Sequence, residues 1–283
     1  MPRVSFVNGR FVRHREAGVH VEDRGYQFAD AVYEVIAVAK GRLVDEGLHL
    51  ERLERSLREI RMEMPFTAGI FRLKVAELLR LNRIVNGSLY LQVSRGVSPR
   101  DHRIPPAIRP SVVMTIRPMT PPSQEMFGRG VSVITVRDIR WRRPDIKSVA
   151  LLPNVLAKDD AVRNDVFEAW QVDNGVVTEG TSTNAWIVSN GALITHPPAD
   201  AILNGVTRLA LVKLAENEGT PIEERPFSVG EAMAADEAFL TSTSSFLLPV
   251  VEIDGKKIGK GTPGPVSRRM MELYNNHVWT EDA

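Results

Sequence analysis

Apolar and polar residues alternate at the start of the chain in the pattern of paired strands. Val4 to Val7 and Phe11 to Arg13 flank Asn8-Gly9. This dipeptide accommodates the positive φ angles of a two-residue turn, so it predicts that the two runs form a hairpin. A further alternating run from Val32 to Val38, followed by Lys40-Gly41, predicts a strand with one more apolar face.

Helical periodicity follows that strand. Apolar residues recur every three or four positions among Glu and Arg from Leu50 to Met64, which predicts an amphipathic helix closed by Pro65. The run from Ile70 to Val85 predicts a second helix, and Ser88 to Val93 and Val112 to Ile116 predict strands. The first part of the chain therefore reads as an α+β unit.

A proline-rich stretch, Arg117-Pro-Met-Thr-Pro-Pro-Ser-Gln124, interrupts this pattern. Its prolines cannot continue a helix or a central strand. We therefore expect a small N-terminal α/β domain over residues 1–118, an interdomain linker over 119–124, and a large C-terminal domain over 125–283.

The second half mixes strands and helices with many tight turns. Strands are predicted at 131–136, 169–172, 186–188, 238–240 and 250–253, and helices at 152–164, 207–218 and 266–274. Asn174-Gly175, Asn190-Gly191 and Asp254-Gly255 predict three more hairpins. We expect an α+β or mixed α/β fold with two domains, in which the larger domain holds a mixed, largely antiparallel sheet.

Composition removes several classes of function. The chain has 36 Lys plus Arg against 35 Asp plus Glu, so no net field attracts nucleic acid or a membrane surface. It has no Cys, and no apolar run approaches the roughly 18 residues of a membrane helix. The N-terminus lacks the pattern of a signal peptide, which favours the cytoplasm. Because the six His residues are scattered, we predict no metal site.

Lys147 is the most distinctive of the eight lysines, because it lies within Asp145-Ile-Lys-Ser-Val-Ala-Leu-Leu-Pro153 beside apolar residues. Burial disfavours an ammonium ion and frees the amine to attack a carbonyl, as in the Schiff base of an aldehyde cofactor. The alternative is a solvated lysine at the end of a strand. Glu179, at the end of an extended run, is a candidate partner for the ring nitrogen of pyridoxal phosphate, or alternatively a carboxylate that stabilises a turn.

Two segments are candidates for holding a phosphate. Asn204-Gly-Val-Thr207 leads directly into a predicted helix, whose N-terminus favours an anion. Thr241-Ser-Thr-Ser-Ser245 follows a short strand and offers hydroxyl donors. Without further context, Thr207 is equally a helix N-cap and the second segment a polar loop.

The order of these segments resembles the fold type IV pyridoxal-phosphate enzymes, and within them the D-amino acid aminotransferases. The resemblance covers nearly the whole chain. The stretches that carry it are Glu22-Asp-Arg-Gly-Tyr-Gln-Phe28, Val32-Tyr-Glu-Val35, Arg95-Gly-Val-Ser-Pro-Arg-Asp-His102, Asp138-Ile-Arg-Trp141, Asp145-Ile-Lys-Ser148, Thr178-Glu-Gly-Thr-Ser-Thr-Asn184 and Ile202-Leu-Asn-Gly-Val-Thr-Arg208.

The resemblance assigns cofactor-binding roles to individual residues. It implies that Lys147 forms the Schiff base and moves the proton between Cα and C4′, and that Glu179 holds the pyridine nitrogen. Leu203 is expected to pack on the cofactor ring, and Arg140 is a candidate donor to its phenolic oxygen. The residues expected around the phosphate are Arg52, Gly205, Val206, Thr207, Ser242 and Thr243. From periodicity alone, Arg52 is a solvated helix arginine and Leu203 a core residue.

The resemblance also implies a substrate and a mechanism. Tyr33, Arg100 and His102 match the group that holds the α-carboxylate, with Arg100 and His102 supplied by the partner subunit of a homodimer. An arginine and imidazole or phenol donors suit a carboxylate chemically. The expected reaction is ping-pong transamination between D-amino acids and 2-oxo acids, with 2-oxoglutarate or pyruvate as acceptor. Branched-chain L-amino acid or R-amine transamination and aminodeoxychorismate lyase activity remain alternatives on the same fold.

Overall fold

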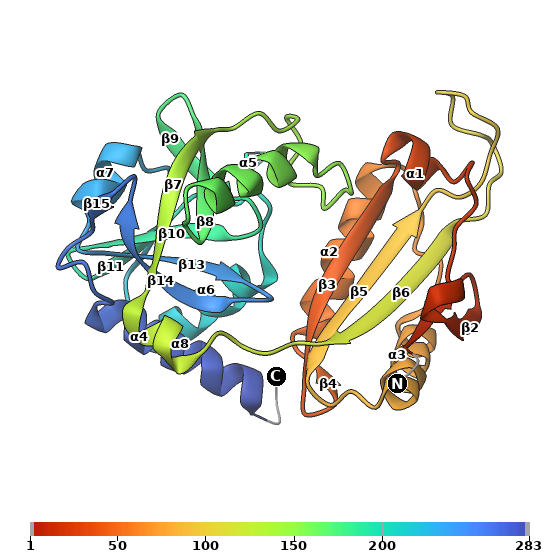
Figure 1. Ribbon diagram of the computed structural model, residues 1–283, viewed down its shortest axis with the longest axis horizontal. Helices are drawn as coiled ribbons and strands as arrows, with labels where there is room; N and C mark the ends of the chain where they lie inside the picture. Colours follow the sequence, from red (N-terminus) through yellow and green to blue (C-terminus); the bar gives the residue numbers. More distant parts are fainter. Residues whose placement is uncertain (1–2, 200, 281–283) are drawn as a thin grey trace. The chain divides into compact units, whose positions relative to one another are not determined.

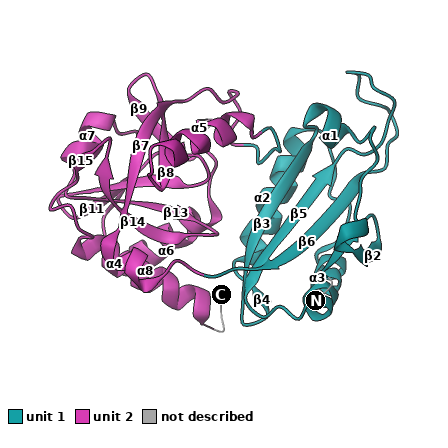
Figure 2. Cartoon of the chain, viewed as in Figure 1, with its two compact units in different colours: residues 1–120, 146–150 teal, residues 121–145, 151–283 magenta. Residues whose placement is uncertain are grey.

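The computed structural model describes residues 3–199 and 201–280 and separates into two compact units (Figures 1 and 2). Unit 1 runs to Thr120 and also includes Ile146–Ala150, whereas unit 2 takes Pro121–Asp145 and the chain from Leu151 onward. The short segment that contains Lys147 therefore belongs by its contacts to unit 1, although it lies within the range 125–283 that we assign to the C-terminal domain from the sequence.

Unit 1 is built on a six-stranded sheet in the order β2-β1-β6-β5-β3-β4, in which every pairing is antiparallel. The strands are β1 (Val4–Val7), β2 (Arg10–Arg13), β3 (Ala31–Ala39), β4 (Arg42–Leu43), β5 (Gly87–Ser94) and β6 (Ser111–Pro118). The helical elements are η1 (His14–Glu16), α1 (Arg24–Phe28), α2 (Glu46–Glu59) and α3 (Ala68–Asn82). Leu53 and Leu57 of α2 and Phe71 of α3 pack into one core with the apolar residues of the sheet.

Unit 2 is built on a nine-stranded sheet in the order β12-β11-β10-β13-β14-β7-β8-β9, with β15 paired to β14. Its strands are β7 (Val131–Arg137), β8 (Glu168–Asp173), β9 (Val176–Gly180), β10 (Asn184–Ser189), β11 (Ala192–Thr195), β12 (Ile222–Glu224), β13 (Glu237–Ser242), β14 (Phe246–Ile253) and β15 (Lys256–Lys257). Its helices are α4 (Gln124–Arg129), α5 (Leu152–Arg163), α6 (Val206–Asn217), α7 (Val229–Ala234) and α8 (Pro265–Trp279).

The larger sheet is mixed, as the sequence predicts. The strands pair in parallel only at β11/β12, β7/β14 and β7/β8, and the remaining described pairs are antiparallel. The antiparallel pairs β8/β9, β10/β11 and β14/β15 are joined by the predicted hairpin turns. The turn at Asn8-Gly9 has φ angles of 47° and 92°, and the other three Asn-Gly or Asp-Gly pairs have two positive φ angles as well. The predicted fold class and all four predicted hairpins are confirmed.

The end of α2 differs from the sequence prediction. The helix stops at Glu59 instead of continuing to Pro65, and Arg61 adopts a left-handed conformation with φ of 58°. The guanidinium of Arg95, which comes from the end of β5, donates to the carbonyl oxygens of Ile60 at 2.6 Å and Arg61 at 3.3 Å. A distant side chain thus satisfies the carbonyls at this helix end, which local periodicity cannot reveal.

Short elements also escaped the sequence patterns, because four to six residues carry little periodicity. Helix α4 begins at Gln124, the last residue of the expected linker, and Ser123 caps it by accepting a hydrogen bond from the Met126 amide at 3.1 Å.

Within residues 3–199 and 201–280, no helix combines the length and the apolar character needed to cross a bilayer.

Candidate functional site

Lys147 is held by its backbone against two elements of unit 1. Its carbonyl accepts a hydrogen bond from the Tyr33 amide of β3 at 3.0 Å, and its own amide donates to Ser56 Oγ of α2 at 3.3 Å. The side-chain amine lies 4.4 Å from the centre of the Tyr33 ring. The amine is therefore presented over an aromatic face, at a half-buried position, and is not a freely solvated lysine at a strand end.

Beside this lysine segment, Glu34 of β3 forms a fully buried ion pair. Arg52 donates to its two carboxylate oxygens through Nε at 2.8 Å and a terminal nitrogen at 2.7 Å, and His49 Nδ1 lies 2.7 Å from Oε2. Burial opposes ionisation of Glu34, but the charge and hydrogen bonds of Arg52 outweigh it and lower its pKa to about 2. Burial lowers the pKa of His49, and because the ionised Glu34 carboxylate can only accept, His49 Nδ1 is the donor of this hydrogen bond.

Tyr33 and Arg52, both predicted from the sequence as ligand-binding residues, are thus fixed by protein contacts. Tyr33 stacks on Tyr90 with ring centres 5.7 Å apart, and the Tyr90 hydroxyl donates to Gln92 Oε1 at 2.7 Å. Burial raises the pKa of Tyr90 to about 12, so this phenol stays protonated. Tyr33 is supported from one side by an aromatic neighbour and carries the Lys147 amine on its ring.

Arg100 and His102 lie in the exposed loop after β5 and meet at Phe28. The Arg100 guanidinium carbon is 4.6 Å from the Phe28 ring centre, and the His102 ring centre is 5.3 Å away. The buried guanidinium of Arg24 donates to the carbonyl oxygen of Asp101 at 2.6 Å. Since Asp101 separates the two predicted carboxylate ligands, Arg24 fixes the backbone that displays them.

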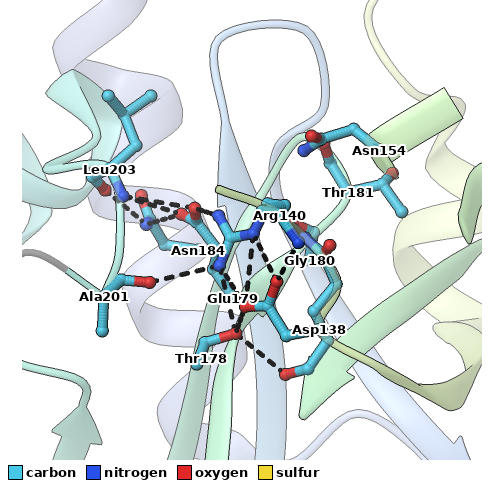
Figure 3. A network of polar contacts seen from close by, with 11 residues as sticks. Asp138, Arg140, Asn154, Thr178, Glu179, Gly180, Thr181, Asn184, Ala201 and Leu203 are labelled. Carbon is cyan, nitrogen blue, oxygen red and sulfur yellow. Dashed lines mark hydrogen bonds and ion pairs between the residues drawn. The ribbon is translucent and has the colours of Figure 1, made fainter. Parts of the chain in front are cut away.

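Glu179 is the centre of the polar network in unit 2 (Figure 3). It lies near the end of β9, with its side chain only 8% exposed, and forms an ion pair with Arg140. Its carboxylate also accepts from Asn184 Nδ2 at 3.1 Å and from the Leu203 amide at 3.2 Å. The donors come from three separate segments, so the orientation of the carboxylate is strongly determined.

Arg140 itself is tied to a second carboxylate. Its Nε and one terminal nitrogen donate to Asp138 at 3.0 and 2.6 Å, and it also donates to the Ala201 carbonyl oxygen at 3.1 Å. Burial opposes ionisation of Asp138, but the bonds from Arg140 lower its pKa. The neighbouring acids raise the pKa of Arg140 despite its burial. In this structure Arg140 fixes Glu179, and a bond to a cofactor's phenolic oxygen stays a prediction.

Helix α6 begins directly beside this network. Its N-cap is Gly205, and no side chain caps the helix, so Thr207 lies within the first turn and is not the N-cap. Thr207 is buried and accepts a hydrogen bond from the Tyr274 hydroxyl at 3.3 Å. The first amides of a helix without a side-chain cap favour an anion, and phosphate binding by Gly205, Val206 and Thr207 stays a prediction.

The remaining candidates lie in unit 2, in the segment before α6, at the end of β13 and in the turn that follows β13. Leu203 is half-buried, and its amide and carbonyl groups bind Glu179 and Asn184. Ser242 Oγ accepts from the Ser245 amide at 3.0 Å and lies 2.6 Å from Ser245 Oγ, which closes the turn around the half-buried Thr243. In the described ranges, no three His, Cys, Asp or Glu side chains gather as a metal-ion site.

Several residues around these candidates were missed in the sequence. Glu34 binds Arg52 and His49, Arg24 anchors the Arg100 loop, and Asn184 contacts Glu179. Glu34 had a signal: it is the single charged residue in the apolar strand Ala31–Ala39. A carboxylate that interrupts such a strand needs a buried partner, which points to an arginine or histidine elsewhere.

Comparison with known proteins places the chain in a family. The model of the amino-transferase class IV family matches residues 31–253. D-alanine aminotransferase of Bacillus licheniformis is 41% identical over 276 residues, which cover 98% of this chain and 97% of that protein.

Solved structures agree with this result. The branched-chain amino acid aminotransferase of Escherichia coli superposes with a TM-score of 0.92 at 24% identity, covering 100% of this chain and 97% of that one, and so supports the fold. The branched-chain aminotransferase of Thermobaculum terrenum in its PLP form has a TM-score of 0.85 at 26% identity, over 98% of this chain and 94% of that one. The chain belongs to the class IV amino-transferase family.

Proposed function

We propose that the protein is a pyridoxal-phosphate-dependent D-amino acid aminotransferase that exchanges amino groups between D-amino acids and 2-oxo acids. A representative reaction converts D-alanine and 2-oxoglutarate to pyruvate and D-glutamate. The observation that carries the proposal is the full-length likeness to a D-alanine aminotransferase. The family's fold, the amine of Lys147 and the anchored carboxylate of Glu179 are consistent with it.

The residues present fit this cofactor. When bound, pyridoxal phosphate supplies an aldehyde that condenses with amines and a ring that withdraws electrons from a breaking Cα–H bond. Lys147 offers a primary amine held over Tyr33, and Glu179 offers a buried carboxylate for a protonated ring nitrogen. The start of α6 offers backbone amides to a phosphate, and no side chain caps them.

The residues then have different tasks in the proposed reaction. Lys147 Nζ takes the proton from the substrate Cα and returns it at C4′ of the cofactor. Glu179 accepts a hydrogen bond from the ring nitrogen and keeps that nitrogen protonated, while Leu203 packs on the ring. Gly205, Val206 and Thr207 bind the phosphate together with Arg52, Ser242 and Thr243. The two hydrogen bonds that Arg52 donates to Glu34 hold its guanidinium in one orientation for this purpose.

Substrate binding depends on the loop that follows β5. We assign the α-carboxylate to Tyr33, Arg100 and His102, with Arg100 and His102 acting in the site of a partner subunit. Arg100 is exposed and oriented by its contact with Phe28, so it is available to a carboxylate. The proposal therefore includes a homodimer as the active form.

A substrate screen tests the reaction. The purified full chain with pyridoxal phosphate is mixed with 2-oxoglutarate and a single D- or L-amino acid or R-amine, or with aminodeoxychorismate, and the products are separated by chiral chromatography. We expect D-alanine to yield pyruvate and D-glutamate in equal amounts. Fast turnover of L-leucine or of R-amines without turnover of D-alanine would contradict the proposal. Formation of pyruvate from aminodeoxychorismate without amino transfer would identify a lyase instead.

A further inference from the structure

Asn184 occupies a position that the sheet of unit 2 determines closely. It is the first residue of β10 and lies opposite Thr241 of β13. A short connection, closed by a 2.8 Å hydrogen bond from the Gly180 amide to the Thr183 carbonyl, leads to it from the end of β9. The residue is only 5% exposed. Its amide group therefore has little freedom to find other partners.

The side chain of Asn184 bridges Glu179 and the loop before α6 (Figure 3). Its Nδ2 donates to Glu179 Oε2 at 3.1 Å and to the Leu203 carbonyl oxygen at 2.9 Å. The Leu203 amide in turn donates to Glu179 at 3.2 Å. An amide nitrogen has two protons, so both are used, and the three groups form a closed ring of hydrogen bonds.

The oxygen of the same side chain packs against the start of α6. A Cβ atom added to Gly205 would lie 2.0 Å from Asn184 Oδ1. The φ angle of Gly205 is −64°, which any residue adopts, so the glycine is needed here for space and not for its conformation. Asn184 therefore touches both the carboxylate and the N-cap of the helix.

We infer that Asn184 is a positioning residue that fixes Glu179 and the N-terminus of α6 relative to each other. The inference rests on the proposed function, in which the carboxylate holds the ring nitrogen and the helix end holds the phosphate. A rigid cofactor needs both groups at one fixed separation. The side chain makes this link by donating to Glu179 and Leu203 and by packing on Gly205.

The test compares Asn184→Ala with Asn154→Ala in the full chain. Asn154 is a matched control because its Nδ2 donates to the nearby Thr181 carbonyl at 2.8 Å, in the same network. In cofactor-free protein, we expect hydrogen exchange at the Leu203 amide to quicken at least ~10-fold in Asn184→Ala. Its Kd for pyridoxal phosphate should rise by ~10- to 100-fold, the range for a lost bond to a charged group. In Asn154→Ala, the exchange rate at the Leu203 amide and the Kd for pyridoxal phosphate should both stay within about twofold of wild type.

Two further readouts separate positioning from general instability. In holoenzyme, kcat should fall while the KM for D-alanine stays within about twofold, because Asn184 has no assigned contact with the substrate. Asn184→Ser, a milder change, serves if the alanine variant does not fold, as judged by near-ultraviolet circular dichroism. Wild-type exchange at Leu203 and an unchanged Kd in a folded variant would overturn the inference. The exchange measurement needs no cofactor, so it tests the inference even if the proposed function is wrong. Failure of the proposed function would appear as wild-type protein that does not bind pyridoxal phosphate.

Discussion

Glu34 and Glu179 are both buried carboxylates paired with arginine, but their surroundings are built differently. Glu34 receives its side-chain bonds from His49 and Arg52, which lie three residues apart on the single helix α2. Glu179 is bound by Arg140, by Asn184 of β10 and by the Leu203 backbone. One carboxylate is held by a single rigid element and the other by three segments.

This difference indicates different tasks. Two oxygens of Glu34 face a guanidinium and an imidazole, and the pKa of about 2 keeps the group ionised throughout the working pH range. It is suited to hold Arg52 in place. Glu179 lies where a loop, a strand and the approach to α6 meet, and donors from all three together determine the orientation of its carboxylate. In the proposed function, this carboxylate accepts the hydrogen bond from the cofactor's ring nitrogen.

Removal of the Lys147 amine, which performs the proton transfer, should reduce turnover more than a change at either glutamate. Lys147→Ala should reduce turnover of D-alanine by about 10⁴-fold or more, because no other assigned group moves the Cα proton. Its thermal midpoint should stay near that of wild type, since the segment is anchored through backbone groups. Lys158→Ala is the control, because Lys158 donates to the Phe167 carbonyl and has no assigned catalytic role. Turnover above a tenth of wild type in Lys147→Ala would contradict the assignment.

Glu179→Gln tests whether that carboxylate acts in the reaction. Loss of the charge should lower kcat by about 10²- to 10³-fold, because a neutral amide does not keep the ring nitrogen protonated. The change is nearly isosteric, so far-ultraviolet circular dichroism should be unchanged. Steady-state kinetics with D-alanine measure the effect, and a kcat within threefold of wild type would show that Glu179, like Glu34, has a structural role only.

Glu34→Gln should act on stability with a defined pH dependence. The pKa of Glu34 is lowered from 4.5 to about 2, so its ionised form stabilises the fold above pH 4.5, and this stabilisation is lost as the pH falls towards 2. We expect the variant to lose about 3 kcal/mol at pH 7, with the difference from wild type shrinking between pH 4.5 and 2. Urea unfolding at several pH values measures it. Glu77→Gln in α3 should change little, because Glu77 is only partly buried and pairs with the exposed Arg80. A Glu34→Gln deficit that does not depend on pH would argue against the buried ion pair.

The smallest expected effect concerns substrate affinity. Arg100→Ala should raise the KM for D-alanine by about 10- to 100-fold and change kcat little, because the guanidinium holds the α-carboxylate and not the reacting bond. Arg103→Ala is the control in the same loop, since Arg103 is exposed and pairs with Asp101. Equal KM values for the two variants would place the carboxylate elsewhere.

Local patterns in the sequence predict the elements well where the cause is local. Asn-Gly and Asp-Gly pairs fix the hairpins because only their own φ angles matter. The predicted end of α2 was wrong because Arg95, far along the chain, donates to the carbonyl oxygens of Ile60 and Arg61. The Lys147 segment joins unit 1 through pairing with β3, which no neighbouring residue signals.

The site residues divide in the same way. Resemblance to the family predicts the roles of Lys147 and Glu179, and the structure gives the contacts of each side chain. The supporting residues Arg24, Glu34 and Asn184 lie within the stretches that resemble the family, but their roles depend on partners from other elements. Charge in an apolar strand, as at Glu34, is the one signal that the sequence alone offers.

In the proposed function, the amine of Lys147 carries the cofactor. The most direct measurement incubates the protein with pyridoxal phosphate, reduces it with borohydride and locates the attached group by peptide mass spectrometry. The account predicts a phosphopyridoxyl group on Lys147 at near one per chain. Attachment mainly to another lysine, or none after reduction, would contradict it.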